Sequence, residues 1–217
     1  MLTGKVALVT GGIGDLGNEM ALHLAQAGAD IAIWDVIDRA RAAARLARVE
    51  ATGRRVLYQQ VDVTDRPGVD EAVSAVVDTL GGLDIVCANA GIVDARPFLE
   101  IAPENWQRHL DINLTGAFNT AQAAARVMVT RGVEGRIIFT SSWVGAVPWP
   151  ENTAYNVSKA GVNMLMKQIA RELAPFGIRA NAVAPGIVNA GLAGRQFAEE
   201  PQYAARAKAV IPLGELG

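Results

Sequence analysis

Near its start the chain reads Val6-Ala7-Leu8-Val9-Thr10-Gly11-Gly12-Ile13-Gly14-Asp15-Leu16-Gly17. The first four residues are all apolar, as in a β-strand that is covered on both faces. A glycine-rich turn follows, and then Leu16, Met20 and Leu24 recur at the four-residue spacing of a helix that Gly28 ends. A strand, a tight turn and a helix in this order predict the first unit of a parallel α/β sheet.

The rest of the chain repeats this alternation of short apolar runs with helical patterns. We expect about six strands, over residues 6–9, 31–34, 56–61, 85–88, 136–140 and 178–184. Further helices are expected over residues 39–50, 69–80 and about 105–131, and a last one holds Lys159 and ends at Gly177. Apolar residues in that last helix recur at the spacing of a buried face: Val162, Leu165, Met166, Ile169 and Leu173. The pattern predicts an α/β protein with a doubly wound parallel sheet (a Rossmann fold), helices on both faces and a single domain over residues 1–217.

Composition excludes several classes of function. With 217 residues, 51% apolar and 19% charged, the chain can bury a sizeable core. A net charge of −2 gives no basic field, so we expect no nucleic-acid partner. Cys87 is the only cysteine, and His23 and His109 are isolated, so no metal site is expected. No apolar run approaches the ~18 residues of a membrane span, and the N-terminus lacks a signal-peptide layout, so a soluble, cytoplasmic protein is expected.

The glycine-rich turn also indicates a ligand. Gly12, Gly14 and Gly17 form G-x-G-x-x-G between a strand and a helix, where backbone N–H groups can hold a pyrophosphate. Asp35 ends the next strand, 35 − 17 = 18 residues on, close to the ~20 expected of a carboxylate that binds an adenosine ribose. Such a carboxylate repels a 2′-phosphate, and the loop contains no Arg or Lys. The sequence therefore favours NAD over NADP.

A second motif carries acid/base chemistry. Tyr155 and Lys159 are four residues apart, so in a helix they lie on one face and can approach each other. A free phenol titrates near ~10, too high for a general base at neutral pH. A neighbouring cation favours the phenolate, and we therefore expect Lys159 to lower the pKa of Tyr155 toward neutrality.

Taken together, these features resemble a classical short-chain dehydrogenase/reductase, and the resemblance covers nearly the whole chain. Each of the further matching motifs follows a predicted strand or lies at a fixed place between strands. They are Thr10-Gly11, Asp62-Val63, Asn89-Ala90-Gly91, Asn113 within 111–116, Ser141-Ser142, Tyr155-x-x-x-Lys159 and Pro185-Gly186.

The resemblance implies a role for each matching residue. Tyr155 would exchange a proton with the substrate oxygen, Ser142 would hydrogen-bond that oxygen, and Lys159 would assist the phenol and hold the nicotinamide ribose. Asn113 would hold a water that links Lys159 to solvent. Ser142 is preferred over Ser141 because it lies 155 − 142 = 13 residues before Tyr155. Cofactor contacts are implied for Gly11, Gly14, Asp15, Leu16, Asp35, Asp62, Val63, Asn89, Tyr155, Lys159, Pro185 and Val188.

The chain departs from the family pattern at three places. Asp15 replaces the middle glycine of the loop, where it could cap the helix but would bring a charge near the pyrophosphate. Ala190 stands where a Thr is common. The sequence stops at Gly217, where the family adds a helix and a seventh strand, so the sixth strand would be an exposed edge. A truncated sequence or a partner covering this edge is the corresponding hypothesis.

The resemblance also implies a homodimer through the helices at 105–131 and 159–174, with Ala121, Ala123, Ala124 and Ala125 allowing close approach. A tetramer is doubtful without the C-terminal segment. Residues 190–212 should cover the substrate, and Trp143, Trp149 and Glu151 could bind a sugar or polyol between indoles and a carboxylate, although loop packing explains them equally well. Ser142 and Tyr155 complete the predicted substrate site.

We therefore expect an NAD-dependent oxidoreductase that transfers a hydride between a nicotinamide cofactor and a secondary alcohol or its ketone. One alternative is an NADPH-dependent 3-oxoacyl-acyl-carrier reductase, which Asp35 disfavours. The other is a non-catalytic dinucleotide-binding module, which the complete set of Asn113, Ser142, Tyr155 and Lys159 disfavours.

Overall fold

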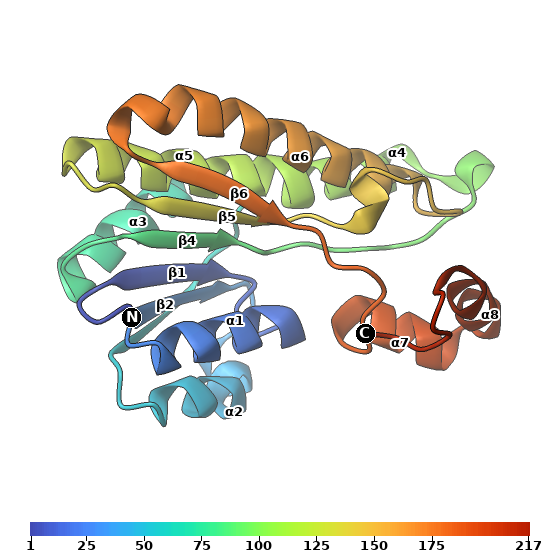
Figure 1. The fold of residues 1–217 in the computed structure, drawn as a ribbon, viewed down its shortest axis with the longest axis horizontal. Helices are drawn as coiled ribbons and strands as arrows, with labels where there is room; N and C mark the ends of the chain where they lie inside the picture. Colours follow the sequence, from blue (N-terminus) through green and yellow to red (C-terminus); the bar gives the residue numbers. More distant parts are fainter.

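The computed structural model describes all residues, 1–217, and has one parallel sheet at its centre (Figure 1). The strands are β1 (Val6–Thr10), β2 (Asp30–Asp35), β3 (Val56–Gln60), β4 (Ile85–Ala88), β5 (Arg136–Thr140) and β6 (Arg179–Val183). Their order across the sheet is β3-β2-β1-β4-β5-β6, and every neighbouring pair is parallel. The direction of the order reverses at β1, so β1 and β4 flank the switch point where ligands bind in such sheets. The predicted doubly wound fold is confirmed.

Helices cover both faces of the sheet (Figure 1). On one face lie α1 (Asp15–Gln26) and α2 (Arg39–Glu50); on the other lie α3 (Arg66–Leu80), α5 (Gly116–Thr130) and α6 (Thr153–Leu173). The apolar strand β1 supplies both cores, because Val6 and Leu8 pack into the larger cluster while Ala7 and Val9 pack into the smaller one. A continuous apolar strand is what two covered faces require.

The predicted elements match the structure closely, with one internal difference. The helix expected over 105–131 consists of α4 (Pro103–His109), a π-helical stretch (Leu110–Thr115) and α5. His109 is buried in this region, where its Nε2 accepts from the Asp94 N–H at 3.1 Å and its Nδ1 lies 2.7 Å from the Asn105 carbonyl. These contacts explain His109 as a structural residue.

One expectation about helix faces is confirmed in part and another is wrong. The stripe on α6 faces the core as predicted, but only Val162 is fully buried, and the other members are partly buried where they pack against the core. The physical reason is that α6 covers the last strand of the sheet, so part of its apolar face has nothing beyond it. The alanines of α5 are buried at 7% exposure or less, packed in the chain's own core. They allow close packing inside the molecule and are not available to a partner.

The carboxyl ends of the strands all point to one side, where α7 (Gly191–Glu199) and α8 (Pro201–Val210) lie beyond the sheet (Figure 1). A small separate cluster packs these helices, and its buried members are Val144, Trp149, Ile187 and Ala207. Strand β6 pairs only with β5, so it forms an open edge, as predicted. No helix has both the length and the apolar character that crossing a membrane demands.

Candidate active site

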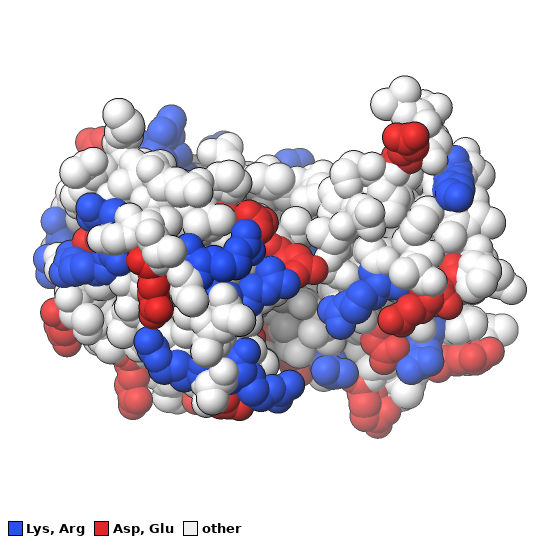
Figure 2. Space-filling model, turned by 90° about the horizontal axis from the view of Figure 1, so that it is seen from below, with Lys and Arg blue, Asp and Glu red and all other residues white.

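A cavity of about 910 Å³ lies at the carboxyl ends of the strands, at the switch point of the sheet. It extends from the glycine-rich loop after β1 to Tyr155 on α6 and Tyr203 on α8. Figure 2, seen from below, shows a hollow between the two halves of the molecule, with Lys and Arg mixed among Asp and Glu around it. The volume is at the upper end of the range for ligand sites, enough for a dinucleotide segment together with a small substrate.

The structure brings nearly all of the predicted site residues together around this one cavity. Its lining includes Gly11, Gly14, Asp15, Leu16, Asp35, Asp62, Val63, Asn89, Ser142, Trp143, Trp149, Tyr155, Lys159, Pro185 and Val188. Asn113 is the exception, because it lies behind the wall. These residues come from the ends of the six strands and from α1 and α6, so no local sequence pattern showed that they would converge.

The glycine loop is shaped for close backbone approach. A Cβ on Gly17 would lie 2.2 Å from the Gly11 carbonyl oxygen, and a Cβ on Gly11 would lie 2.9 Å from the Ala90 Cα. Gly11 also has a φ of +61°, in the left-handed region. The N-cap of α1, Gly14, provides no side-chain cap, so the first-turn N–H groups of this helix are free to hold an anion. This geometry fits the pyrophosphate of a dinucleotide.

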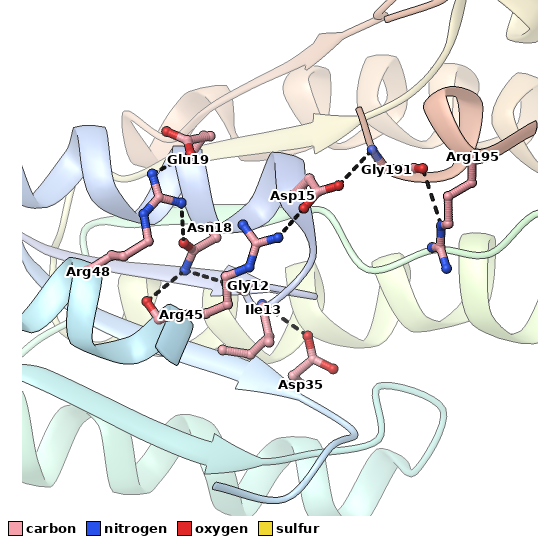
Figure 3. A network of polar contacts seen from close by, with 10 residues as sticks. All are labelled: Gly12, Ile13, Asp15, Asn18, Glu19, Asp35, Arg45, Arg48, Gly191 and Arg195. Atoms are coloured by element: carbon pink, nitrogen blue, oxygen red, sulfur yellow. Dashed lines mark hydrogen bonds and ion pairs between the residues drawn. The ribbon is translucent and has the colours of Figure 1, made fainter. Parts of the chain in front are cut away.

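Asp15 does not cap α1, so that expectation is wrong. Figure 3 shows its carboxylate bridging two other elements: Oδ2 accepts from the Gly191 N–H at 2.8 Å, and Oδ1 pairs with the Arg45 guanidinium of α2. The Gly191 hydrogen bond is the main cause that lowers the pKa of Asp15, and Arg45 lowers it further. Arg45 also offsets the charge that the sequence placed near the pyrophosphate. The sequence did not predict Arg45 as a partner of Asp15, because the two residues lie 45 − 15 = 30 positions apart.

Asp35 lies at the end of β2, beside the loop. Its Oδ2 accepts from the Ile13 N–H at 3.1 Å, and its Oδ1 accepts from the Val36 N–H at 2.9 Å (Figure 3 draws the first). Both hydrogen bonds fix the carboxylate at the cavity wall, and each oxygen keeps lone-pair capacity for a hydroxyl donor. Asp62 and Val63 continue the same wall, with Asp62 accepting from the Thr64 N–H at 2.9 Å.

Asn89 and Val188 use their polar groups differently. The Asn89 Nδ2 donates to the Thr10 carbonyl at 3.0 Å and its Oδ1 accepts from the Thr140 hydroxyl at 2.9 Å, so the side chain holds the loop against β5. Val188 has no backbone hydrogen bond, whereas its neighbours Ile187 and Asn189 bond to Gly217 at 3.1 and 2.8 Å. The free N–H and C=O of Val188 therefore fit a carboxamide.

Ser142, Tyr155 and Lys159 meet on the opposite wall. Ser142 is close enough to Tyr155 for its hydroxyl to act on the phenol, whereas Ser141 turns away and donates to Asn163 Oδ1 at 2.6 Å. Lys159 Nζ lies 5.5 Å from the centroid of the Tyr155 ring and donates to the Thr140 carbonyl at 2.7 Å. This arrangement explains the choice of Ser142 over Ser141.

The lowering of the Tyr155 pKa, expected from Lys159 together with a positive nicotinamide, is not found in the chain by itself. Burial raises the pKa of Tyr155, and only the hydrogen bond with Ser142 acts to lower it. Burial also lowers the pKa of Lys159 to about 8, because the residue is only 3% exposed and its ammonium has lost solvation. The ammonium lies near the ring and donates to the Thr140 carbonyl.

Asn113 lies in the π-helical stretch, a local widening that recurs at functional sites. Its Oδ1 accepts from the Ile92 N–H at 2.8 Å, and its Nδ2 donates to the Ile92 carbonyl and to Ser158 Oγ, both at 3.0 Å. A Cβ on Gly91 would lie 3.2 Å from Asn113 Oδ1 and 3.5 Å from Lys159 Nζ, so the two groups are close. The predicted water-holding role stays a prediction.

Aromatic rings line the cavity near Tyr155. Trp143 and Trp149 pack edge-to-face with centroids 5.4 Å apart, and Tyr203 of α8 packs against Trp149 at 6.0 Å. The pKa of Tyr203 is raised, first by burial. Tyr203 was missed because no spacing pattern links α8 to the loop before α6. Glu151 does not reach the cavity: it pairs with Arg206 of α8 at 2.9 Å. The carboxylate suggested for sugar binding is therefore engaged elsewhere.

Comparisons with known proteins agree with this geometry. The 3beta-hydroxysteroid dehydrogenase 1 of Eggerthella lenta is 37% identical over 216 residues, covering 100% of this chain and 82% of that protein. The L-2,3-butanediol dehydrogenase of Corynebacterium glutamicum is 36% identical, covering 87% of this chain and 73% of that protein. A solved NAD⁺-bound xylitol dehydrogenase superposes with a TM-score of 0.93 at 32% identity, covering 100% of this chain and 88% of that one.

The family model described as short chain dehydrogenase matches residues 5–201, from β1 to the start of α8. This range contains the glycine loop, Asp35 and the wall formed by Ser142, Tyr155 and Lys159. The chain belongs to the short-chain dehydrogenase family of oxidoreductases.

Proposed function

We propose that this protein is an NAD-dependent oxidoreductase acting on a secondary alcohol or its ketone, with Tyr155 as the general acid/base. The observation that carries the proposal is the single cavity: the glycine loop and Asp35 line one end, and Ser142, Tyr155 and Lys159 line the other. A reacting carbon placed between these ends would face the phenol and the nicotinamide position at once.

The proposed roles follow from the contacts. The N-terminus of α1 and the glycine loop bind the pyrophosphate, Asp35 binds the adenosine ribose, and the backbone of Val188 binds the carboxamide. Ser142 orients the substrate oxygen, Tyr155 exchanges its proton, and Lys159 donates hydrogen bonds to the ribose hydroxyls from the buried wall. A bound nicotinamide would supply hydride acceptance or donation. The protein's own part is to position, to exclude water and to move the proton.

NAD is preferred over NADP in this proposal because Asp35 presents a carboxylate where a 2′-phosphate would lie. Among the relatives compared above, an NAD⁺-bound xylitol dehydrogenase and an L-2,3-butanediol dehydrogenase support a small alcohol as substrate. A cytoplasmic location and a homodimer belong to the same proposal.

The test follows nicotinamide absorbance with NAD or NADP against polyols, sugars, hydroxysteroids, simple secondary alcohols and 3-hydroxyacyl esters. Turnover of a secondary alcohol with a higher kcat/KM for NAD is the expected result. Preference for NADP would overturn the argument from Asp35, and no turnover with either cofactor would favour a dinucleotide-binding module. Asp35→Arg should shift the preference toward NADP.

A further inference from the structure

Asn152 stands out among the buried polar side chains. Only three buried side-chain atoms in the chain lack a hydrogen-bond partner: Arg54 Nε, Asn152 Oδ1 and Asn156 Oδ1. Asn152 is 8% exposed and is the only one of these residues that lines the cavity. Buried polar atoms are nearly always paired in proteins, so an unpaired amide in a ligand cavity needs a reason.

Folding does not provide that reason. Asn152 occupies the N-cap position of α6, where an asparagine side chain ordinarily accepts a hydrogen bond from the first turn. Here the side chain makes no cap hydrogen bond, and only the Asn152 backbone carbonyl is engaged, by the Asn156 N–H at 2.7 Å. The amide therefore contributes no hydrogen bond from Oδ1 to the fold.

The position of Asn152 relates it directly to the phenol. Tyr155 follows three residues later, in the first turn of the helix that Asn152 precedes. Helical side chains also lean toward the N-terminus, which carries the Tyr155 ring over the turn that begins at Asn152. Both residues line the same cavity.

We propose that the Asn152 amide binds a second oxygen of the substrate, on the carbon next to the one that reacts, so that vicinal diols and their α-hydroxyketones are preferred. The inference rests on the proposed function. Oxygens on neighbouring carbons lie within one hydrogen-bond length of each other, which suits two side chains that are three residues apart and line one cavity. A more distant hydroxyl would meet the rings of Trp149 and Tyr203 instead.

The chemistry of the reaction is unchanged. The reacting carbon gives a hydride to the nicotinamide and its oxygen gives a proton to Tyr155, so the alcohol loses two electrons and two hydrogens. The second oxygen keeps its proton throughout and donates it to Asn152 Oδ1, the unpaired atom. A monohydroxy alcohol leaves that atom unpaired in the complex as well.

The experiment compares 2,3-butanediol with 2-butanol, by kcat/KM with NAD, for the wild type, Asn152→Leu and Asn152→Asp. The wild type should prefer the diol by about tenfold or more, as one recovered hydrogen bond predicts. Asn152→Leu should lower the diol-to-butanol ratio by about tenfold, and Asn152→Asp, which keeps an acceptor, should retain most of it. Asn152→Leu should not lower Tm, because no hydrogen bond from Oδ1 is lost.

Asn156→Leu is the matched control. Asn156 has the same side chain and also an unpaired buried Oδ1, but it lies outside the cavity lining and its Nδ2 donates to the Trp149 carbonyl at 3.1 Å. This variant should lower Tm and leave the diol-to-butanol ratio within about twofold.

An unchanged ratio in Asn152→Leu, or a wild type that does not distinguish the two alcohols, would overturn the inference while leaving the oxidoreductase proposal in place. Absence of turnover with either alcohol and either cofactor would instead contradict the proposed function, and this inference with it. A lower Tm for Asn152→Leu would assign the residue a structural role.

Discussion

The buried Tyr155 phenol has a raised pKa, so the chain alone holds it protonated at neutral pH. A protonated phenol is a ready acid for carbonyl reduction, whereas alcohol oxidation needs the phenolate as base. We therefore expect kcat/KM for oxidation to rise as the pH increases above neutral. Burial raises the pKa of Tyr155, whereas the neighbouring Ser142 hydroxyl lowers it.

Removing the phenolic hydroxyl tests this role directly. Tyr155→Phe should reduce turnover by about 10²–10⁴-fold, because that is the usual contribution of a positioned acid/base. NAD binding, measured by calorimetry, should survive, since the glycine loop and Asp35 are untouched. A variant with a near-normal rate would remove Tyr155 from the acid/base role.

The burial of Lys159 should make the free energy of unfolding depend on pH. Its pKa falls to about 8 in the folded chain from the ordinary value of 10.5, because burial disfavours the ammonium. The unfolded chain therefore binds more protons between those values, and the folded state gains stability as the pH rises through that window. Relative to Lys159→Met, the wild-type free energy of unfolding should increase by up to about 3 kcal/mol between pH 8 and 10.5.

Denaturant unfolding of both proteins across this pH range measures the difference. Lys167, exposed on the same helix, provides the control: the curves of Lys167→Met and wild type should stay parallel. Parallel curves for Lys159→Met as well would show that the buried amine is not desolvated in solution. Activity of Lys159→Met should be lost at every pH.

Among the helices, α7 depends on a contact from the far end of the sequence. Asp15 at the start of α1 accepts from the Gly191 N–H, and Arg45 of α2 holds the same carboxylate. The bond joins the cofactor loop to the segment proposed to cover the substrate. We expect Asp15→Ala to loosen α7 and α8, raising KM several-fold while changing Tm little.

Limited trypsin digestion measures how loosely α7 and α8 are held, because the cleavage sites Arg195, Arg206 and Lys208 lie in these two helices. Cleavage there should be faster in Asp15→Ala, and Asp15→Asn should be intermediate, since an amide oxygen still accepts from Gly191 but no longer pairs with Arg45. Equal cleavage in all three proteins would show that the bond does not hold the segment. Because the pKa of Asp15 is lowered, its carboxylate stays ionised below the ordinary value of 3.8. The stability that this contact adds is complete above pH 3.8 and is lost as the pH falls through the lowered pKa.

These contacts also show what the sequence could and could not predict. Strands and helices were foreseen because apolar periodicity is local, and the walls of the cavity followed from motifs at strand ends. Contacts between distant segments, such as Asp15 with Gly191 or Glu151 with Arg206, leave no periodic signal. Burial, which raises the pKa of Tyr155 in the chain by itself, was not foreseen because a four-residue spacing gives proximity but not burial.

For the whole molecule, the two walls of the cavity come from different halves of the sheet. The strands β1, β2 and β3 present the glycine loop, Asp35 and Asp62, whereas β4, β5 and β6 lead to Asn89, Ser142 and Pro185. The geometry of the cavity therefore depends on the sheet holding its two halves in fixed positions. Strand β6 at the edge of the sheet and the partly buried apolar face of α6 lie on the half that leads to Ser142 and Pro185.

The predicted homodimer must use surface other than the buried alanines of α5. Three apolar side chains of α5 and α6 remain exposed: Phe118 at 39%, Val157 at 43% and Met164 at 63%. Val157 and Met164 are seven residues apart, so they lie on one face of α6.

Sedimentation of the wild type should give twice the 22.9 kDa chain mass. Met164→Glu should shift the sedimenting mass toward the monomer, because a buried carboxylate opposes association. Leu99→Glu, which changes a 94% exposed leucine on neither helix, should leave the dimer intact. A wild-type monomer at micromolar concentration, or dissociation by both variants alike, would contradict an interface on these helices.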